Sequence, residues 1–321
     1  MKKKIICLFM GAMFLVGCGG IDESTVENTD GVATTEVTDE EDASELSSTN
    51  YTLTAIDTDG YAMTEDTAEI EDAYTKYTEA VSNTQNMHNY TVTTKIVANQ
   101  QSDDTNYCID SLDLIEILVD NTTDGAEQLK STTSYSDSTM DSALDATVYY
   151  RDKTVYYNEG DLKLKVENQD YTTMDPTYAD VINGITFETN AIISAGEADG
   201  VGVFVLDPSL VTFSNTYAVP TDEMETLVLE YEIQDNLVVN STFNYTVKTN
   251  TATIQENTGV ETEEAEAEGA TQSDVTFDYS VNTLYTDIGK TVIDYPDFSD
   301  YKTEEELTAE QSTEQSTESV E

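Results

Sequence analysis

The feature that most constrains the fold is a set of segments in which apolar and polar residues alternate with a period of two. Residues 162–166 place Leu and Val between charged residues, and the pattern recurs at 227–233, 237–247 and 275–281. Successive side chains of a β-strand point to opposite faces of a sheet, so each segment predicts a strand with one apolar face. Such half-buried strands are typical of antiparallel sheets.

Short polar segments between these strands favour tight turns. Asp152-Lys153 joins Tyr149–Arg151 to Val155–Tyr157, and Gln234–Asn236 separates two long strands. Consecutive hairpins of this kind predict a meander. Further strands are expected at residues 89–97, 112–119, 127–135 and 200–206.

One amphipathic helix precedes the strands, at about residues 66–85. Its apolar residues recur at spacings of three and four: Ile70, Ala73, Tyr74, Tyr77, Ala80 and Val81. Asp66, with Glu69 three residues later, predicts a capped N-terminus. One or two short helices that cross the sheet are expected between Asp175 and Ala195. The predicted fold class is α+β, mainly antiparallel β, with about ten strands.

The first residues carry a different signal. Lys2 to Lys4 precede an apolar run, Ile5–Val16, that is too short for a membrane-spanning helix of about 20 residues. Leu15-Val16-Gly17-Cys18 ends this run and resembles the lipobox of bacterial lipoprotein signal peptides. The resemblance implies that residues 1–17 are removed and that Cys18 carries a diacylglyceryl group and acyl chains such as palmitate. The alternative is an ordinary secretory signal with an unrelated cysteine.

Composition divides the remaining chain into folded and unfolded parts. Residues 18–63 are acidic, contain no Lys or Arg, and predict a disordered tether. Residues 64–302 are enough for one large domain. Within this domain, residues 256–273 are rich in Glu and predict a disordered loop in an enlarged hairpin. Residues 303–321 form an acidic low-complexity tail.

The charge of the chain excludes one class of partner. The sequence has 65 Asp and Glu against 13 Lys and Arg, for a formal net charge of −52. Nucleic-acid binding requires clustered Lys and Arg, so no nucleic-acid partner is expected. Attachment to a membrane must likewise depend on acyl chains and not on a basic patch.

Few residues suit catalysis or metal binding. His88 is the only histidine, and no Gly-x-Ser-x-Gly motif accompanies it, which favours a structural or surface role. Cys108 is the one cysteine after Cys18 and is predicted to be a small buried apolar residue. Asp57–Tyr61 echoes part of a calcium loop but lacks two of its ligand positions, so it predicts a turn. We therefore expect a protein that is not an enzyme, with no metal site and no cofactor.

Tyrosines are the remaining candidates for function. Tyr149-Tyr150 and Tyr156-Tyr157 lie on one hairpin, and each pair places one ring on each face of the sheet. Packing across the strands and the lining of a cavity between sheet and helices both explain these rings. The residues expected to line such a cavity are Tyr150, Tyr157, Leu229, Tyr231, Phe243 and Tyr279.

The order of these parts resembles the LolA/LppX-like superfamily of bacterial envelope lipoproteins, especially its uncharacterised Gram-positive members. The resemblance rests on the lipobox, the acidic tether, the helix that leads into Asn89–Val92, the Tyr-rich hairpin, and the closing segment Tyr295–Phe298. It implies a curved, unclosed half-barrel whose concave face is covered by helices and holds an acyl chain or a lipoprotein lipid.

Two functional hypotheses follow. The first is a non-catalytic, monomeric lipoprotein on the extracytoplasmic face of the cell membrane that binds a lipid or another hydrophobic ligand in the half-barrel. The second is a cell-envelope interaction protein with a filled core, whose acidic surface binds a basic protein partner or cations. A hydrolase, the weakest alternative, would require turnover that depends on His88.

Overall fold

The computed structural model describes residues 51–103, 108–122, 127–140, 142–170, 185–213, 224–250 and 273–309. Cys18, the predicted signal peptide, most of the predicted tether and residues 256–272 of the predicted loop lie outside the described residues. The helices and strands are η2 (Thr58–Gly60), α2 (Thr67–Gln85), β1 (Asn89–Ser102), β2 (Asp110–Asp120), β3 (Leu129–Asp137), β4 (Leu144–Arg151), β5 (Thr154–Glu159), β6 (Leu162–Glu167), β7 (Ile185–Thr186), η6 (Thr189–Ala191), β8 (Ile192–Ala198), β9 (Val201–Leu206), η7 (Pro208–Leu210), β10 (Thr212–Phe213), β11 (Met224–Gln234), β12 (Leu237–Asn250) and β13 (Asp274–Thr286).

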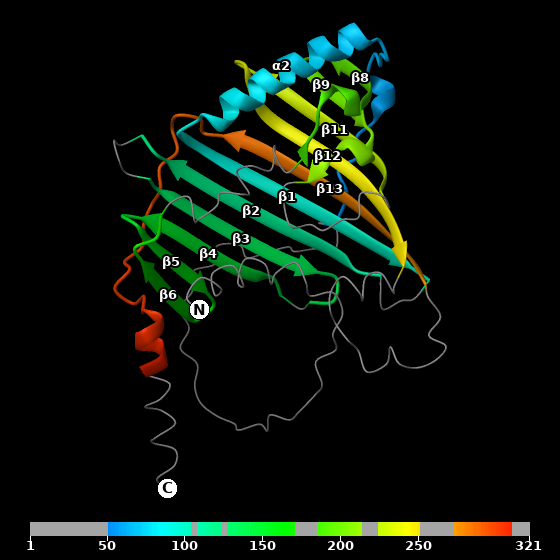
Figure 1. Cartoon of the computed structure of the whole chain (residues 1–321). Coiled ribbons are helices and arrows are strands. Elements are labelled where there is room, and N and C mark those ends of the chain that lie inside the picture. The colour runs from blue at the N-terminus through cyan, green and yellow to red at the C-terminus, as the bar shows by residue number, and fades with distance from the viewer. Residues whose placement is uncertain are drawn as a thin grey trace, which may run out of the picture.

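Eleven strands form one curved antiparallel sheet in the order β6-β5-β4-β3-β2-β1-β13-β12-β11-β9-β8 (Figure 1). The chain enters at the centre with β1 and meanders outward to β6. It resumes at the opposite edge with β8 and returns to β13, which pairs with β1. Within the described residues β6 and β8 do not pair, so the sheet stays open. The predicted fold class is confirmed, with eleven strands in this sheet in place of about ten.

The tight turns have the backbone that two-residue hairpins require. Asp152 and Lys153 both have positive φ, of 52° and 61°, and Asp235 and Asn236 have φ of 50° and 61°. Turns with two left-handed residues match the right-handed twist of the strands that they join. The predicted hairpins at both places are confirmed.

Helix α2 begins and ends close to the predicted positions. The Asp66 carboxylate accepts hydrogen bonds from the backbone N–H groups of Ala68 and Glu69, at 2.9 and 3.3 Å. These bonds satisfy two N–H groups that have no partner inside the helix. The N–H of Asp66 itself donates to Thr64 Oγ1 at 3.1 Å.

The second helical region was predicted wrongly where the structure describes it. Residues 185–186 and 192–198 are strands, and only Thr189–Ala191 form a turn of 3-10 helix, whereas residues 175–184 lie outside the described residues. The pairing of β8 with β9 shifts register between Ile192 and Ser194. Such a bulge interrupts the period of two, which explains why the apolar spacing did not indicate a strand.

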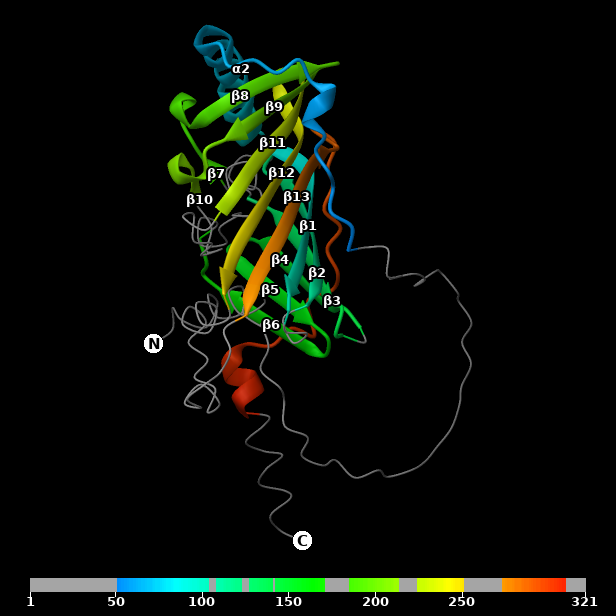
Figure 2. The same ribbon diagram turned by 90° about the vertical axis from the view of Figure 1, so that its right-hand side faces the viewer.

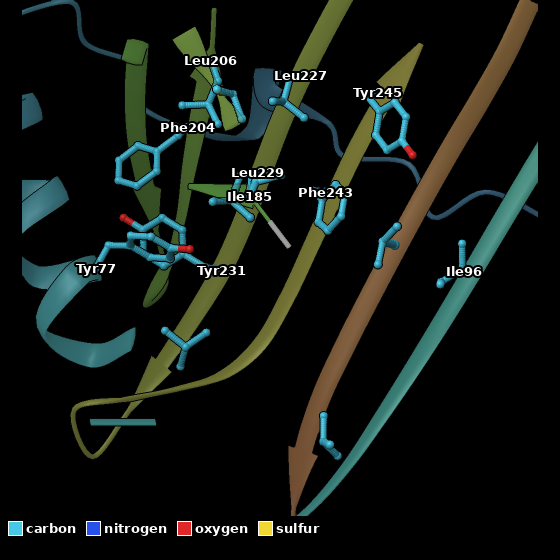
Figure 3. Packing of buried hydrophobic residues seen from close by; sticks show 14 of the residues in the cluster. Tyr77, Ile96, Ile185, Phe204, Leu206, Leu227, Leu229, Tyr231, Phe243 and Tyr245 are labelled. Carbon is cyan, nitrogen blue, oxygen red and sulfur yellow. The ribbon is translucent and has the colours of Figure 1, made fainter. Parts of the chain in front are cut away.

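The sheet has two distinct faces. Directly paired residues of neighbouring strands point to the same side, so the register assigns each side chain to one face. The inner face carries α2 and the hydrophobic core, which includes Val92 and Ile115. Leu229 and Phe243 belong to the same core and are labelled in Figure 3. We call the opposite side the outer face.

Residues 51–65, which we call the N-terminal strap, lie along the outer face (Figure 2). Thr54 receives a hydrogen bond from Asn244 Nδ2 at 2.7 Å, and its N–H donates to Ser280 Oγ at 3.2 Å. The Tyr61 hydroxyl donates to Glu230 at 2.6 Å. The folded part therefore begins earlier than residue 64. The predicted tether, residues 18–63, therefore ended too late in the sequence. The strap is held largely by polar contacts, and such contacts leave no apolar pattern from which it could be predicted.

Residues 288–302, the C-terminal strap, lie on the outer face of the other half of the sheet. The Phe298 ring stacks on Tyr156, with centroids 3.7 Å apart and planes at 10°, and its edge packs on Tyr149. Tyr301 contacts Tyr156 edge to face at 5.5 Å. These rings fix the strap on the outer side of the Tyr-rich hairpin.

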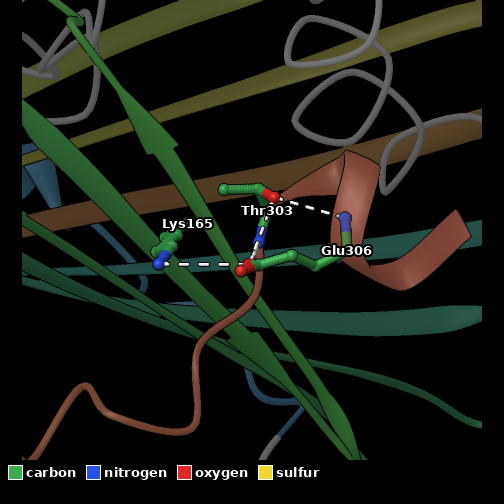
Figure 4. Close-up of polar contacts among 3 residues, drawn as sticks. All are labelled: Lys165, Thr303 and Glu306. Atoms are coloured by element: carbon green, nitrogen blue, oxygen red, sulfur yellow. Dashed lines mark hydrogen bonds and ion pairs between the residues drawn. The ribbon is translucent and has the colours of Figure 1, made fainter. Parts of the chain in front are cut away.

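The predicted tail begins with a helical turn over residues 304–309. Thr303 N–H donates to Glu306 Oε2 at 2.7 Å, and Glu306 N–H donates to Thr303 Oγ1 at 3.3 Å, which is a capping box (Figure 4). Lys165 lies 4.0 Å from the same carboxylate. Residues 303–309 therefore form a capped helical turn beside β6. Residues 310–321 lie outside the described residues.

Both edges of the sheet are covered by the straps. Thr64 and Ala195 exchange backbone hydrogen bonds of 2.7 and 3.0 Å at the β8 edge. At the β6 edge, Lys165 N–H donates to the Lys302 carbonyl at 2.9 Å. Covered edges protect an open sheet from pairing with another chain.

Candidate functional site

The inner face begins, beneath α2, with a cluster of aromatic rings. Tyr77 of α2 lies 4.8 Å from Tyr231 of β11 and 5.6 Å from Phe204 of β9, measured between ring centroids (Figure 3). Gly202 makes room for one of these rings, since a Cβ at that position would lie 2.3 Å from the Tyr231 ring. Helix and sheet are thus closely packed at this end.

A row of stacked rings follows on β12 and β13. Phe243 and Tyr245 are 6.0 Å apart, Tyr245 and Tyr279 are 4.6 Å apart, and Tyr279 and Phe277 are 6.0 Å apart. Their planes lie within 15° of one another in each pair. The row forms because Tyr245 and Tyr279 are direct cross-strand partners.

The inner face continues over β1 to β6 with a partly aliphatic surface, to which β3 adds the polar Ser131 and Thr133 beside Leu129. Ile115, Ile117 and Val119 of β2 project onto it, with Val148 and Val155 from β4 and β5. Helix α2 packs on β8 and β12 at the other end, and β2–β6 lie away from it (Figure 1). The apolar inner face thus extends well beyond the area that α2 covers.

All six residues expected to line a cavity belong to the inner face. Tyr150, Leu229, Tyr231 and Phe243 are buried in the core cluster, and Tyr157 and Tyr279 pack against it partly buried. The structure therefore brings them to one side of one sheet, although their role as a ligand lining stays a prediction. Tyr149 and Tyr156 face the outer side, so each Tyr-Tyr pair divides between the two faces as predicted.

Several tyrosine hydroxyls on the inner face have no hydrogen-bond partner among the residues that the structure describes. Tyr77, Tyr231 and Tyr279 form no hydrogen bond through their side chains with any residue that the structure describes. Burial raises the pKa of Tyr279 to about 12 and raises the pKa values of Tyr77 and Tyr231 as well. These hydroxyls stay protonated and can donate to a polar group on a ligand.

Asp113 is a polar residue of this face that the sequence analysis missed. Its side chain is 5% exposed and lies in register between Ile96 of β1 and Tyr135 of β3. The buried Oδ1 accepts no hydrogen bond from a described residue, and burial raises the pKa of Asp113 to about 7. The sequence did contain a signal for its burial. In the period of two, Asp113 falls on the same face of β2 as Ile115 and Ile117, and on the face opposite the exposed Glu116.

Three other candidates have ordinary structural roles. Cys108 is exposed, with its thiol donating to the Ser102 carbonyl at 3.2 Å, so the prediction of a buried residue was wrong. It lies just before β2, outside the paired part of the sheet. His88 is exposed, and its carbonyl accepts a hydrogen bond from Asn121 N–H at 2.7 Å. Asp57 caps the 3-10 turn η2 by accepting from Asp59 N–H at 3.0 Å.

The described part of the chain holds neither a metal-binding cluster nor a membrane-spanning helix. None of its groups of His, Cys, Asp and Glu side chains has the three members that could hold a metal ion. No helix among these same residues is both long and apolar enough to cross a membrane.

The fold and this face define a protein with an open antiparallel sheet and an extended apolar inner surface. No family model and no curated protein matches the sequence. Among solved structures, the crystal structure of LprF from Mycobacterium bovis is similar, with a TM-score of 0.36 and 11% sequence identity. The match covers 70% of this chain and 97% of that chain.

Proposed function

We propose that this protein is a non-catalytic lipoprotein that binds a lipid or another hydrophobic ligand on the inner face of its open sheet. The observation that carries the proposal is the extent of that face, which is apolar from β9 to β5 while α2 packs at one end only. The aliphatic side chains of this face are themselves buried, since Ile115, Ile117, Val119, Val148 and Val155 are between 1% and 8% exposed. A buried, mostly apolar lining is typical of a site for apolar ligands.

The energy available from such a surface is sufficient for binding. Burial of one CH2 group contributes about 0.8 kcal/mol, so a chain of about 12 carbons contributes up to about 9 kcal/mol before the costs of association. The hydroxyls of Tyr77, Tyr231 and Tyr279, which have no hydrogen-bond partner among the described residues, add donors to a mostly apolar surface.

The proposed membrane anchor is the acylated Cys18, on the extracytoplasmic side of the cell membrane. The N-terminal strap begins at Tyr51, so the chain between Cys18 and the domain has room for a flexible tether of roughly 30 Å root-mean-square length. The strap lies on the outer face, so the tether starts on the side of the sheet opposite the proposed ligand.

Native mass spectrometry of the full chain, extracted from its own membrane in a neutral detergent, tests anchor and ligand together. We expect a polypeptide that begins at Cys18 with a diacylglyceryl adduct, and an additional non-covalent mass that is released on unfolding. A chain without added mass, together with no saturable binding of a neutral alkyl probe, would contradict the binding proposal and favour the envelope interaction protein with a filled core.

A further inference from the structure

The basic residues are distributed unequally between the two faces of the sheet. Apart from Lys2 to Lys4, the chain has ten Lys and Arg residues, and all ten lie in the described part. Six project from strands onto the outer face: Lys95, Lys130, Arg151, Lys163, Lys165 and Lys248. The other four lie on the surface of α2, in turns and at the β6 edge. None of the ten projects onto the inner face.

The inner face carries acidic groups instead, and most of them are already satisfied. Asp137 accepts from the Tyr135 hydroxyl at 3.1 Å and from Thr139 N–H at 2.7 Å. Glu159 accepts from the Tyr157 hydroxyl, and Glu197 is exposed to water. Asp113 differs from all three, because it is 5% exposed and its side chain forms no hydrogen bond or ion pair with a described residue.

Asp113 has no partner among the described residues, and its charged form is costly in such a buried place, so a donor at this position would stabilise it. Burial of an ion without a countercharge is unfavourable unless hydrogen bonds or an opposite charge compensate it. Two neighbours of Asp113 in the sheet are Ile96 and Ile115, which offer no donor, and the Tyr135 hydroxyl is already engaged with Asp137. The compensating donor must therefore come from outside this cluster.

We propose that the ligand of the inner face is an amphiphile with a protonated amine head group, which pairs with Asp113 while its apolar chain lies on the aliphatic surface of β1–β6. This inference rests on the proposed function and names its ligand class. Fatty acids and anionic phospholipids are disfavoured because their head groups would find no Lys or Arg on this face and would be repelled by Asp113.

Three probes with the same 12-carbon chain test the inference on the folded full-length protein, which carries Asp113 in its native setting. Calorimetric titration at pH 8, at physiological salt and below the critical micelle concentrations, compares dodecylammonium, dodecanoate and neutral dodecyl maltoside. We expect dodecylammonium to bind at least about tenfold more tightly than dodecanoate. Asp113→Asn should weaken dodecylammonium binding by at least about tenfold and leave dodecyl maltoside within about twofold.

A matched control separates a specific pair from the general attraction of an acidic protein for cations. Glu116→Gln removes one charge from the same strand, but Glu116 is exposed on the outer face. This variant should bind dodecylammonium like the wild type. Circular dichroism checks that both variants are folded.

The outcomes distinguish this inference from the proposed function. Equal affinity for dodecanoate and dodecylammonium, or equal losses from Asp113→Asn and Glu116→Gln, would overturn the amine proposal while binding of dodecyl maltoside still supports a hydrophobic site. Failure of all three probes to bind would contradict the proposed function itself.

Discussion

Asp113 makes the fold less stable as pH rises, whereas a salt-bridged carboxylate makes a fold more stable as pH rises. Burial raises its pKa from 3.8 to about 7, so the folded protein holds this proton more tightly than the unfolded chain. The charged groups nearest to it on the inner face include Asp137, and the phenol of Tyr135 is the titratable group directly across the strand pair. The contribution of Asp113 to stability therefore falls as pH rises from about 4 to about 7.

Asp113→Asn should remove this dependence, because the amide stays neutral at every pH. We expect the free energies of unfolding of variant and wild type to agree within about 1 kcal/mol at pH 4, and the variant to be more stable by up to about 4 kcal/mol at pH 8. Urea denaturation without ligand measures both. A difference that is the same at the two pH values would contradict the account, and Glu116→Gln serves as the control for loss of one acidic charge.

At the scale of single residues, the sequence indicated the inner-face side chains more clearly than their partners. Alternation placed Leu229, Tyr231 and Phe243 on one face because a strand has a fixed period. Asp113 was missed because the cost of its burial depends on neighbours in β1 and β3 that are distant in sequence. Cys108 was assigned to the core from its residue type, whereas its place before β2 leaves it exposed.

At the scale of elements, the strands with strict alternation and α2 with its Asp66 cap could be predicted, because those signals are local. Strand β8 could not be predicted, because a register shift near Ile192 interrupts its alternation of apolar and polar residues. The two straps could not either, because strands far away in the sequence hold them in place.

The C-terminal strap gives a test at this scale. Phe298→Ala removes a ring that contacts Tyr149, Tyr156 and Tyr301, and we expect a loss of about 2 kcal/mol, less than for a fully buried ring. Hydrogen exchange should rise in residues 288–302 before it rises in β1. Val292→Ala is the matched control, since Val292 is 72% exposed in the same strap and should change stability by less than about 0.5 kcal/mol. Equal effects of the two substitutions would show that the strap is not held by its aromatic contacts.

At the scale of the whole molecule, the topology places the two straps on the side of the sheet opposite the proposed binding face. Both straps lie on the outer face and cover the two edges, so neither residues 51–65 nor residues 288–302 occupy the apolar inner face. The antiparallel meander was predictable from consecutive hairpins. The pairing of β1 with β13 at the centre of the sheet was not predictable, because it joins residues at opposite ends of the domain.

The central claim is that the inner face receives an apolar ligand, and the absence of Trp from the chain allows a direct measurement. Tyr279→Trp places a single indole on the inner face, and Leu284→Trp places one on the outer face of the same strand, at a position that is 41% exposed. Each variant is titrated with dodecyl maltoside brominated on its alkyl chain, below the critical micelle concentration. The account predicts saturable quenching of the inner indole at one probe per chain and little quenching of the outer one. Equal quenching of both, or none of the inner indole in a folded variant, would contradict it.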